Sequence, residues 1–232
     1  MVWKRVFLLL LGITGSILTA GVLVMSAESA GTVQQAPEIL SEPTLSNITL
    51  PAGVPGTALI AYRVSAYDGP FLEDGTDREV FDVAALLVYN GGSKMLTSAE
   101  IELKYPDSIY TFTGDYIPPG SWIMLLEQKG RPYRKDAPLG CAGTQTVDFD
   151  ETVLPVLVED TTCGMQVCNT GNDTLKDIHV YYKTWLHFPG FYIGGITYHS
   201  VIPQLEPGQW VSLQPYHYAP GSSKVVSISG RK

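Results

Sequence analysis

The sequence predicts an all-β protein: two tandem antiparallel β-sandwich domains that follow an apolar N-terminal helix and a proline-rich linker. After residue 56 the chain is rich in β-branched and aromatic residues, and Gly and Pro interrupt it at short intervals. The segment 96–105 alternates apolar and charged positions, and a block near residue 88 recurs near residue 167. These observations divide the 232 residues into an N-terminal helix at 1–25, a linker at 26–56, and domains at 57–140 and 141–232.

The N-terminal helix is predicted from an uncharged apolar run at residues 6–25, preceded by Lys4 and Arg5. A helix of this length rises about 30 Å, the thickness of a bilayer core. No Lys or Arg follows the run until Arg63, so the rest of the chain is predicted to be extracytoplasmic. A signal peptide cleaved near residue 27–30, which would leave a secreted protein, is the competing interpretation. The length of the run favours an uncleaved membrane anchor.

The linker at 26–56 is predicted from its composition. It contains Pro37, Pro43, Pro51 and Pro55, with Ser, Thr, Gln and Glu between them. A segment with so little periodic apolar pattern cannot bury enough surface to fold by itself, and its prolines favour an extended chain.

Strands are predicted from two kinds of pattern. Residues 57–67 are rich in Val, Ile, Tyr and Ala and are bounded by Gly and Pro, and residues 84–90 are another apolar run. Residues 96–105 place their apolar side chains at alternate positions and charges between them, which is the period of a half-buried strand. A helix would mix those charges with the apolar positions, so we expect a strand.

The duplication is predicted from two blocks that recur in the same order. The first reads Val-x-Asn-x-Gly-x-x-x-Leu at 88–96 and again at 167–175. The second reads Pro-Gly-x-Trp followed by Ile or Val at 119–123 and again at 207–211. Asn and Gly tolerate positive φ, and Pro-Gly is turn chemistry, so both blocks predict turns between strands. The second copy has nine extra residues between its two blocks.

These blocks resemble the small bacterial immunoglobulin-like domains of the cell-adhesion-related (CARDB-like) and FxLYD-like kind. The match covers about 84–127 and 165–213. The segments "YYKTW", "GGITY" and "GSSKVVSI" are also similar to uncharacterised exported and membrane-anchored proteins of anaerobic Gram-positive bacteria. The resemblance implies two immunoglobulin-like domains and supplies no catalytic residue.

The three cysteines are Cys141, Cys163 and Cys168. Outside the cytoplasm a disulfide is allowed. Cys163 and Cys168 are too far apart on one extended segment to bond with each other. Alternation places Cys163 on the inner face with Met165 and Val167, so a single bridge is expected between Cys141 and Cys163. Three unbridged buried thiols remain the open alternative.

The remaining motifs favour a function without catalysis. With a net charge of −8 and no basic run, the chain is not predicted to bind nucleic acid. It lacks a nucleophile elbow, a phosphate loop, a dinucleotide fingerprint and a zinc-protease motif, so no catalytic residue, metal or cofactor is predicted. We therefore expect a membrane-anchored extracytoplasmic module that binds or supports other parts of the cell envelope. The alternative is an exported hydrolase or thiol enzyme that uses Cys168 with a nearby His.

The acidic segment at 68–82 can be interpreted either as a calcium-binding loop or as a solvated loop. It carries six carboxylates, and Ca²⁺ favours several carboxylates on one flexible loop. Because their spacing does not fit the EF-hand loop, a solvated loop is the preferred interpretation.

The candidate partner site lies in the extra residues of the second copy. Seven aromatic residues fall between Tyr181 and Tyr198. Aromatic side chains beside a turn suit recognition of a protein or glycan of the envelope, because they bury a large area with little loss of rotamer freedom. The alternative is that they pack against the first domain and fix the angle between the two domains. The candidate residues are Trp185, Phe188, Phe191 and Tyr192, of which Phe188 and Phe191 are expected to be accessible.

Overall fold

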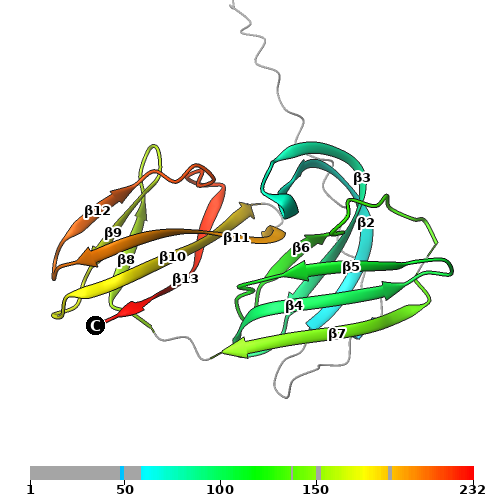
Figure 1. Cartoon of the computed structure of the whole chain (residues 1–232), viewed down its shortest axis with the longest axis horizontal. Helices are drawn as coiled ribbons and strands as arrows, with labels where there is room; N and C mark the ends of the chain where they lie inside the picture. The colour runs from blue at the N-terminus through cyan, green and yellow to red at the C-terminus, as the bar shows by residue number, and fades with distance from the viewer. Residues whose placement is uncertain (1–47, 50–58, 137, 150–152, 188–189) are drawn as a thin grey trace, which may run out of the picture. The chain divides into compact units, whose positions relative to one another are not determined.

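The described part of the computed structural model is all-β, as the sequence predicts (Figure 1). It comprises residues 48–49, 59–136, 138–149, 153–187 and 190–232, all within one compact unit, Pro37–Lys232. Among these residues the single helical element is the short 3-10 helix η1, and none is long and apolar enough to cross a bilayer. The helix predicted at 6–25 and nearly all of the linker predicted at 26–56 lie outside the described residues.

The described residues form thirteen strands, numbered in chain order. Their bounds are β1 Ile48–Thr49, β2 Leu59–Phe71, β3 Arg78–Asn90, β4 Met95–Lys104, β5 Ile109–Gly114, β6 Trp122–Leu126, β7 Gly140–Phe149, β8 Val156–Asp160, β9 Met165–Asn169, β10 Leu175–Leu186, β11 Phe191–Leu205, β12 Trp210–Leu213 and β13 Ser223–Arg231, with η1 at Leu72–Asp74 between β2 and β3.

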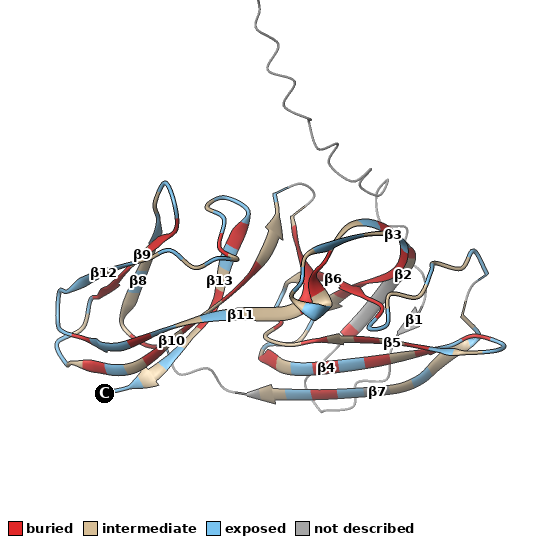
Figure 2. Cartoon of the chain, turned by 45° about the horizontal axis from the view of Figure 1, so that its top comes forward, coloured by how far each residue is buried: buried red, intermediate tan, exposed pale blue. Residues whose placement is uncertain are grey.

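The same set of strand pairings occurs twice. In residues 59–149, here called the first half, β2-β3-β6 and β5-β4-β7 are antiparallel sheets. In residues 153–232, the second half, β8-β9-β12 and β11-β10-β13 repeat this arrangement. In each half apolar side chains of both sheets form a common core, and the buried positions are seen along the strands in Figure 2. The duplication inferred from the sequence is therefore present in the topology.

The repeated asparagine has the same role in each half. Asn90 is fully buried, and its Nδ2 donates to the carbonyl oxygens of Lys94 and Ile117 at 3.0 Å. Its Oδ1 accepts from the N–H of Gly92 at 3.0 Å. Asn169 is equally buried and makes all three contacts at 2.8–2.9 Å. The partners of Asn169 are the carbonyl oxygens of Asp173 and Leu205 and the N–H of Gly171.

The repeated Pro-Gly turn closes onto the same asparagine. Gly120 and Gly208 have φ values of 68° and 72°, in the left-handed region where glycine is favoured. The N–H of each donates to the backbone carbonyl of its asparagine, Asn90 or Asn169, at 2.8 Å. The two sequence blocks of each copy therefore meet at one place in the fold.

The two halves share a sheet through β11. Its first residues pair in parallel with β6, with Tyr192 opposite Ile123 and Ile193 opposite Met124. Its later residues pair antiparallel with β10, so one seven-stranded sheet runs β1-β2-β3-β6-β11-β10-β13. Figure 1 shows β11 extending from the second half to β6 of the first. The domain boundary predicted at 140–141 falls at the start of β7, which pairs with β4 of the first half.

The middle strand β3 is covered on both faces. Six consecutive residues from Val83 to Val88 are buried, so its sequence is an apolar run without alternation. One face contributes to the core of the first half. The other face packs in a second cluster, here called the outer cluster, together with Leu72 of η1 and with Phe191 and Ile193 of β11.

Candidate functional site

The most unusual site in the described structure is a bulge where β11 passes from β6 to β10. In the register of β10 and β11, Tyr182 lies opposite Tyr198, and Thr184 lies opposite Ile193. One residue of β10, Lys183, therefore faces four residues of β11, 194–197. The extra residues turn the β11 backbone around the lysine side chain.

Lys183 has no exposed surface, and oxygen atoms surround its ammonium group. Nζ donates to the carbonyl oxygens of Gly195 at 2.7 Å and Ile196 at 2.8 Å, and it lies 3.4 Å from Oδ1 of Asp115. Burial lowers the pKa of Lys183 to about 8, although the carboxylates of Asp115 and Glu73 oppose that shift. A lysine amine this close to neutral form at physiological pH is uncommon.

Asp115 belongs to the first half, directly after β5, and it is held against β11. Its Oδ1 accepts from the Thr197 hydroxyl at 2.7 Å, and its backbone N–H donates to the Gly195 carbonyl at 3.1 Å. Its side chain is 43% exposed, so solvent reaches one side of the carboxylate.

Glu73 of η1 supplies a second carboxyl group to the bulge. Both of its oxygens accept from the N–H of Gly195 at 2.9 Å, and Oε1 also accepts from the N–H of Leu126 at 2.9 Å. Burial raises the pKa of Glu73, while the backbone hydrogen bonds and Lys183 act in the opposite direction. Glu73, Asp115, Lys183, Gly195 and Thr197 form what we call the junction cluster, because they join the two halves.

Two adjacent glycines make the bulge possible. Gly194 has a φ of 79°, and an added Cβ there would lie 2.8 Å from Cβ of Leu72. An added Cβ at Gly195 would collide with the carbonyl oxygen of Thr113. A Gly-Gly pair inside a strand is the sequence signal that could have located this site, since glycine in a strand marks a bulge or a close backbone approach. The sequence predictions did not include Lys183, Asp115 or Glu73 in a site.

A second polar contact joins the halves beside the junction cluster. Nδ1 of His217, between β12 and β13, lies 3.1 Å from Oδ2 of Asp77 in the β2–β3 connection. The His217 ring stacks on Tyr198 of β11, with centroids 4.1 Å apart. Burial, with the nearby Asp77 carboxylate, raises the pKa of Tyr198 to about 12.

The acidic segment 68–82 is thus partly structural. Asp74 is exposed and accepts hydrogen bonds from Thr76 and Arg78, which lower its pKa. Oδ1 of Asp68 accepts from the N–H of Asp82 at 2.7 Å. No group of three or more His, Cys, Asp or Glu side chains in the described residues is arranged to hold a metal ion. The prediction of a solvated loop agrees with the exposed side chain of Asp74. It is wrong for Glu73, whose carboxyl group is hydrogen-bonded in the junction cluster.

The predicted aromatic site is largely core. Phe191 and Tyr192 are 2% and 7% exposed, and they pack into the outer cluster and the first-half core respectively. Trp185 is half-buried, between the Tyr192 ring at 4.7 Å and Nζ of Lys224 at 3.5 Å. Phe188 lies outside the described residues. The prediction that Phe191 is accessible is wrong, because both faces of β11 are covered where it pairs with β6. Phe191 and Tyr192 instead pack against the first half, as the alternative interpretation expected.

The cysteines also depart from the sequence prediction. Met165 and Val167 are buried as expected, but Cys163 lies in a bend before β9 and is exposed, so alternation does not extend to it. Cys168 is buried, with Leu157 and Trp210 opposite it on the neighbouring strands. The structure does not form the predicted Cys141–Cys163 bridge. Sγ of Cys141 instead donates to the carbonyl of Gly143, and Sγ of Cys163 accepts from Nε2 of Gln214, both at 3.1 Å.

Comparison with known proteins gave no match to any family model, to any curated protein or to any solved structure.

Proposed function

We propose that the chain is a non-catalytic, membrane-anchored extracytoplasmic protein whose two immunoglobulin-like β-sandwiches act as one structural and binding module of the cell envelope. The observation that carries the proposal is the sharing of β11 between the halves. Tandem domains usually move relative to each other unless a large apolar contact joins them. Here backbone pairing, the outer cluster and the junction cluster all connect the halves.

These contacts between the halves suit a protein whose two halves must keep a fixed position relative to each other. The nine residues that distinguish the second copy lie where β10 and β11 extend toward the first half. They lengthen a hairpin that would otherwise end within its own sheet, and they supply Phe191 to the outer cluster. A spacer or scaffold gains from this extension a fixed position of one half relative to the other.

The anchor and the linker support the location. Residues 6–25 suit a membrane span, and 26–56 would hold the two sandwiches away from the membrane surface.

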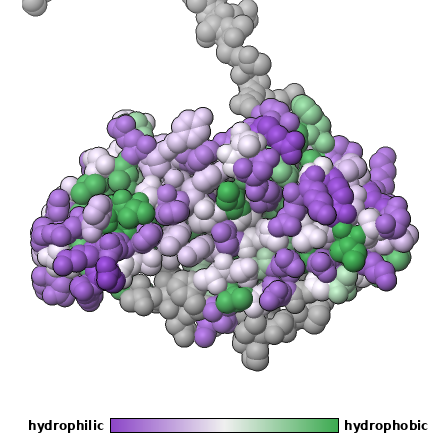
Figure 3. Space-filling model, viewed as in Figure 1, coloured by the Kyte–Doolittle hydropathy of each residue, from purple (hydrophilic) through white to green (hydrophobic). Residues whose placement is uncertain are grey.

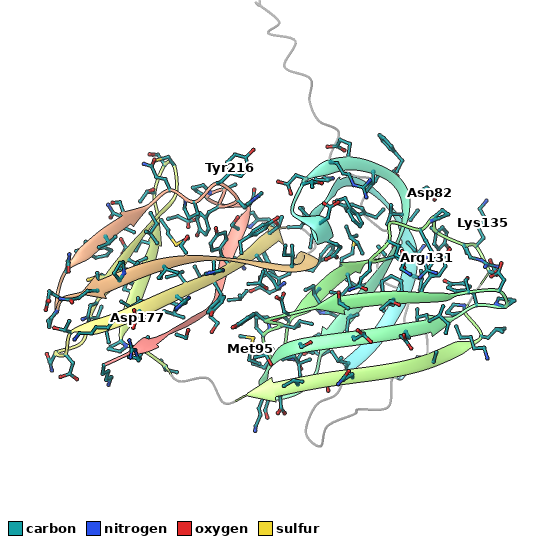
Figure 4. All side chains as sticks on the ribbon, viewed as in Figure 1. Asp82, Met95, Arg131, Lys135, Asp177 and Tyr216 are labelled. Atoms are coloured by element: carbon teal, nitrogen blue, oxygen red, sulfur yellow. The ribbon has the colours of Figure 1, made fainter. Side chains whose placement is uncertain are left out.

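The partner would be a protein or a glycan of the envelope. Tyr216 is 93% exposed on the connection between β12 and β13, where Figure 4 labels it. The face shown in Figure 3 has hydrophobic residues scattered among hydrophilic ones, the usual surface of a folded protein.

Burial of Cys168 argues against the thiol-enzyme alternative. A catalytic cysteine is normally partly exposed in an electropositive environment. Cys168 is 6% exposed and flanked by Leu157 and Trp210. The exposed thiol, Cys163, has Gln214 as its neighbour, and an amide is not a general base.

The location is tested by labelling intact cells with a membrane-impermeant maleimide. If the sandwiches are extracytoplasmic, Cys163 reacts without lysis, because it is exposed. The Cys163→Ser variant should lose that label, and the buried Cys168 should react only after denaturation. Labelling of Cys163 only after lysis would contradict the proposed location. Fast labelling of Cys168 in the folded chain would instead favour the thiol enzyme.

A further inference from the structure

The junction cluster places a primary amine against a carboxyl group from the other half of the chain. Nζ of Lys183 is 3.4 Å from Oδ1 of Asp115, and the lysine has no exposed surface. From this geometry we propose that Lys183 and Asp115 condense to an isopeptide bond that joins β10 covalently to the end of β5.

The condensation balances without any other reactant. The Nζ lone pair attacks Cγ of Asp115, a C–N bond forms, and the C–O bond to one carboxyl oxygen breaks. That oxygen leaves as water with two protons: one that the ammonium transfers to the carboxyl group to free the lone pair, and one that the nitrogen loses as the amide forms. An ammonium and a carboxylate thus become one neutral amide and one water molecule, and nothing is oxidised or reduced.

The fold favours the amide over the ion pair in two ways. Keeping an ammonium group buried is unfavourable because the charge loses its hydration, and a neutral amide removes that charge. The fold also holds both groups in place: the β11 bulge surrounds Lys183, while Thr197 and the Gly195 carbonyl fix Asp115. Well-oriented intramolecular reactions reach effective concentrations of about 10⁵ M or more.

The electrostatics of the cluster supply the reactive form of the amine. With a pKa of about 8, roughly half of the Lys183 side chains are neutral near pH 8, whereas an ordinary lysine is almost wholly charged there. Glu73 interacts electrostatically with Lys183, and its own pKa is raised by burial. Glu73 is therefore a positioning residue, whose charge sets the balance between ammonium and amine. The exposed side of Asp115 gives the released water a path to solvent.

The test is an intact-mass measurement on the full chain, purified in detergent and incubated near pH 8. The wild-type chain should be lighter than its sequence mass by one water molecule. Lys183→Arg keeps the charge but forms no amide, so it should show its full mass, and Lys176→Arg, an exposed lysine of β10, should behave as wild type. Asp115→Asn should lose ammonia instead of water, a result that no structural role produces. Glu73→Gln should change the rate of the loss and its dependence on pH.

Peptide mapping separates this bond from another dehydration. The chain contains Asp68-Gly69 and Asp74-Gly75, and Asp-Gly pairs can lose water by forming a succinimide. That ring joins no second segment and opens again in alkali. The proposal requires a branched peptide that contains both Asp115 and Lys183. Wild-type chain that is folded, melts cooperatively and keeps its full mass after prolonged incubation would overturn it, as would a water loss that maps to either Asp-Gly pair alone. This wild-type result decides the matter even if Lys183→Arg fails to fold.

Discussion

At the scale of single residues, the repeated asparagine links the sequence motif to the fold. In each copy the side chain donates to two backbone carbonyl groups and accepts from one backbone N–H. A buried polar group that loses its partner costs about 1–3 kcal/mol, so this side chain holds together strands that are distant in sequence. Its conformational role explains why a polar residue occupies a fully buried position.

Removing either asparagine should therefore destabilise the protein by a similar amount. We expect Asn90→Ala and Asn169→Ala each to lower the free energy of unfolding by about 3 kcal/mol. Urea titration followed by tryptophan fluorescence measures this change. Asn172→Ala, at an exposed position of the same turn, is the control and should change stability by less than about 0.5 kcal/mol. Equal effects at positions 172 and 169 would contradict the role assigned to Asn169.

Glu73 should give the stability a characteristic pH dependence. Burial raises its folded-state pKa above the value of about 4.3 expected in the unfolded chain. Its stabilising contribution is therefore fully present below that unfolded value and is lost as pH rises through the folded-state pKa. Relative to Glu73→Gln, the wild type should be more stable at pH 4 than at pH 7. Glu100→Gln, an exposed glutamate of β4, should show no such trend; a wild-type advantage that grows with pH would contradict this assignment.

At the scale of elements, the bulge of β11 depends on Gly195. Ala at this position would place Cβ against the carbonyl oxygen of Thr113, and backbone cannot move aside as a side chain can. We expect Gly195→Ala to lower the free energy of unfolding by about 3 kcal/mol. Gly140→Ala is the matched control, because an added Cβ there meets nothing within 4 Å. Comparable stability of both variants in urea would show that the bulge is not tightly packed.

The two halves differ at the elements that β11 covers. Met124 and Leu126 of β6 are buried in the outer cluster, whereas the corresponding residues are Ser212 of β12 and Gln214 directly after it, both exposed. The first half needs an apolar outer face because β11 packs against it. The second half has no such cover among the described residues, and its outer face is correspondingly polar at these positions.

Local patterns predicted most of these elements. Alternation in 96–105 predicted β4, and the repeated blocks predicted the turns at Asn90, Asn169, Gly120 and Gly208. Pairing between β6 and β11 could not be predicted in this way, because it joins segments far apart in sequence and leaves no periodic signal. Lys183 was missed for a related reason: a lysine on a strand normally predicts an exposed position, and only the fold reveals the oxygens around it.

At the scale of the whole molecule, the shared sheet should make the halves unfold together. We expect a single calorimetric transition for the wild type. Phe191→Ser removes a ring that is 2% exposed in the outer cluster, and a loss of about 4 kcal/mol corresponds to a fall in Tm of roughly 10 °C. The transition should also broaden or divide as the halves uncouple.

The control for this prediction is Phe81→Ser. Phe81 is 76% exposed on β3, so its replacement should leave the Tm nearly unchanged. If Phe191→Ser melts like the wild type, in one transition at the same temperature, Phe191 does not couple the two halves.

The late position of β11 in the chain also affects the order in which parts of the protein can fold during synthesis. During synthesis the first half emerges well before Phe191, and until then the apolar side chains of Met124 and Leu126 lack the part of their cover that Phe191 and Ile193 provide. The nascent first half is therefore expected to be prone to aggregation until β11 has been synthesised. A chain truncated after β7 should aggregate, while the complete chain stays dispersed once its late strand has arrived.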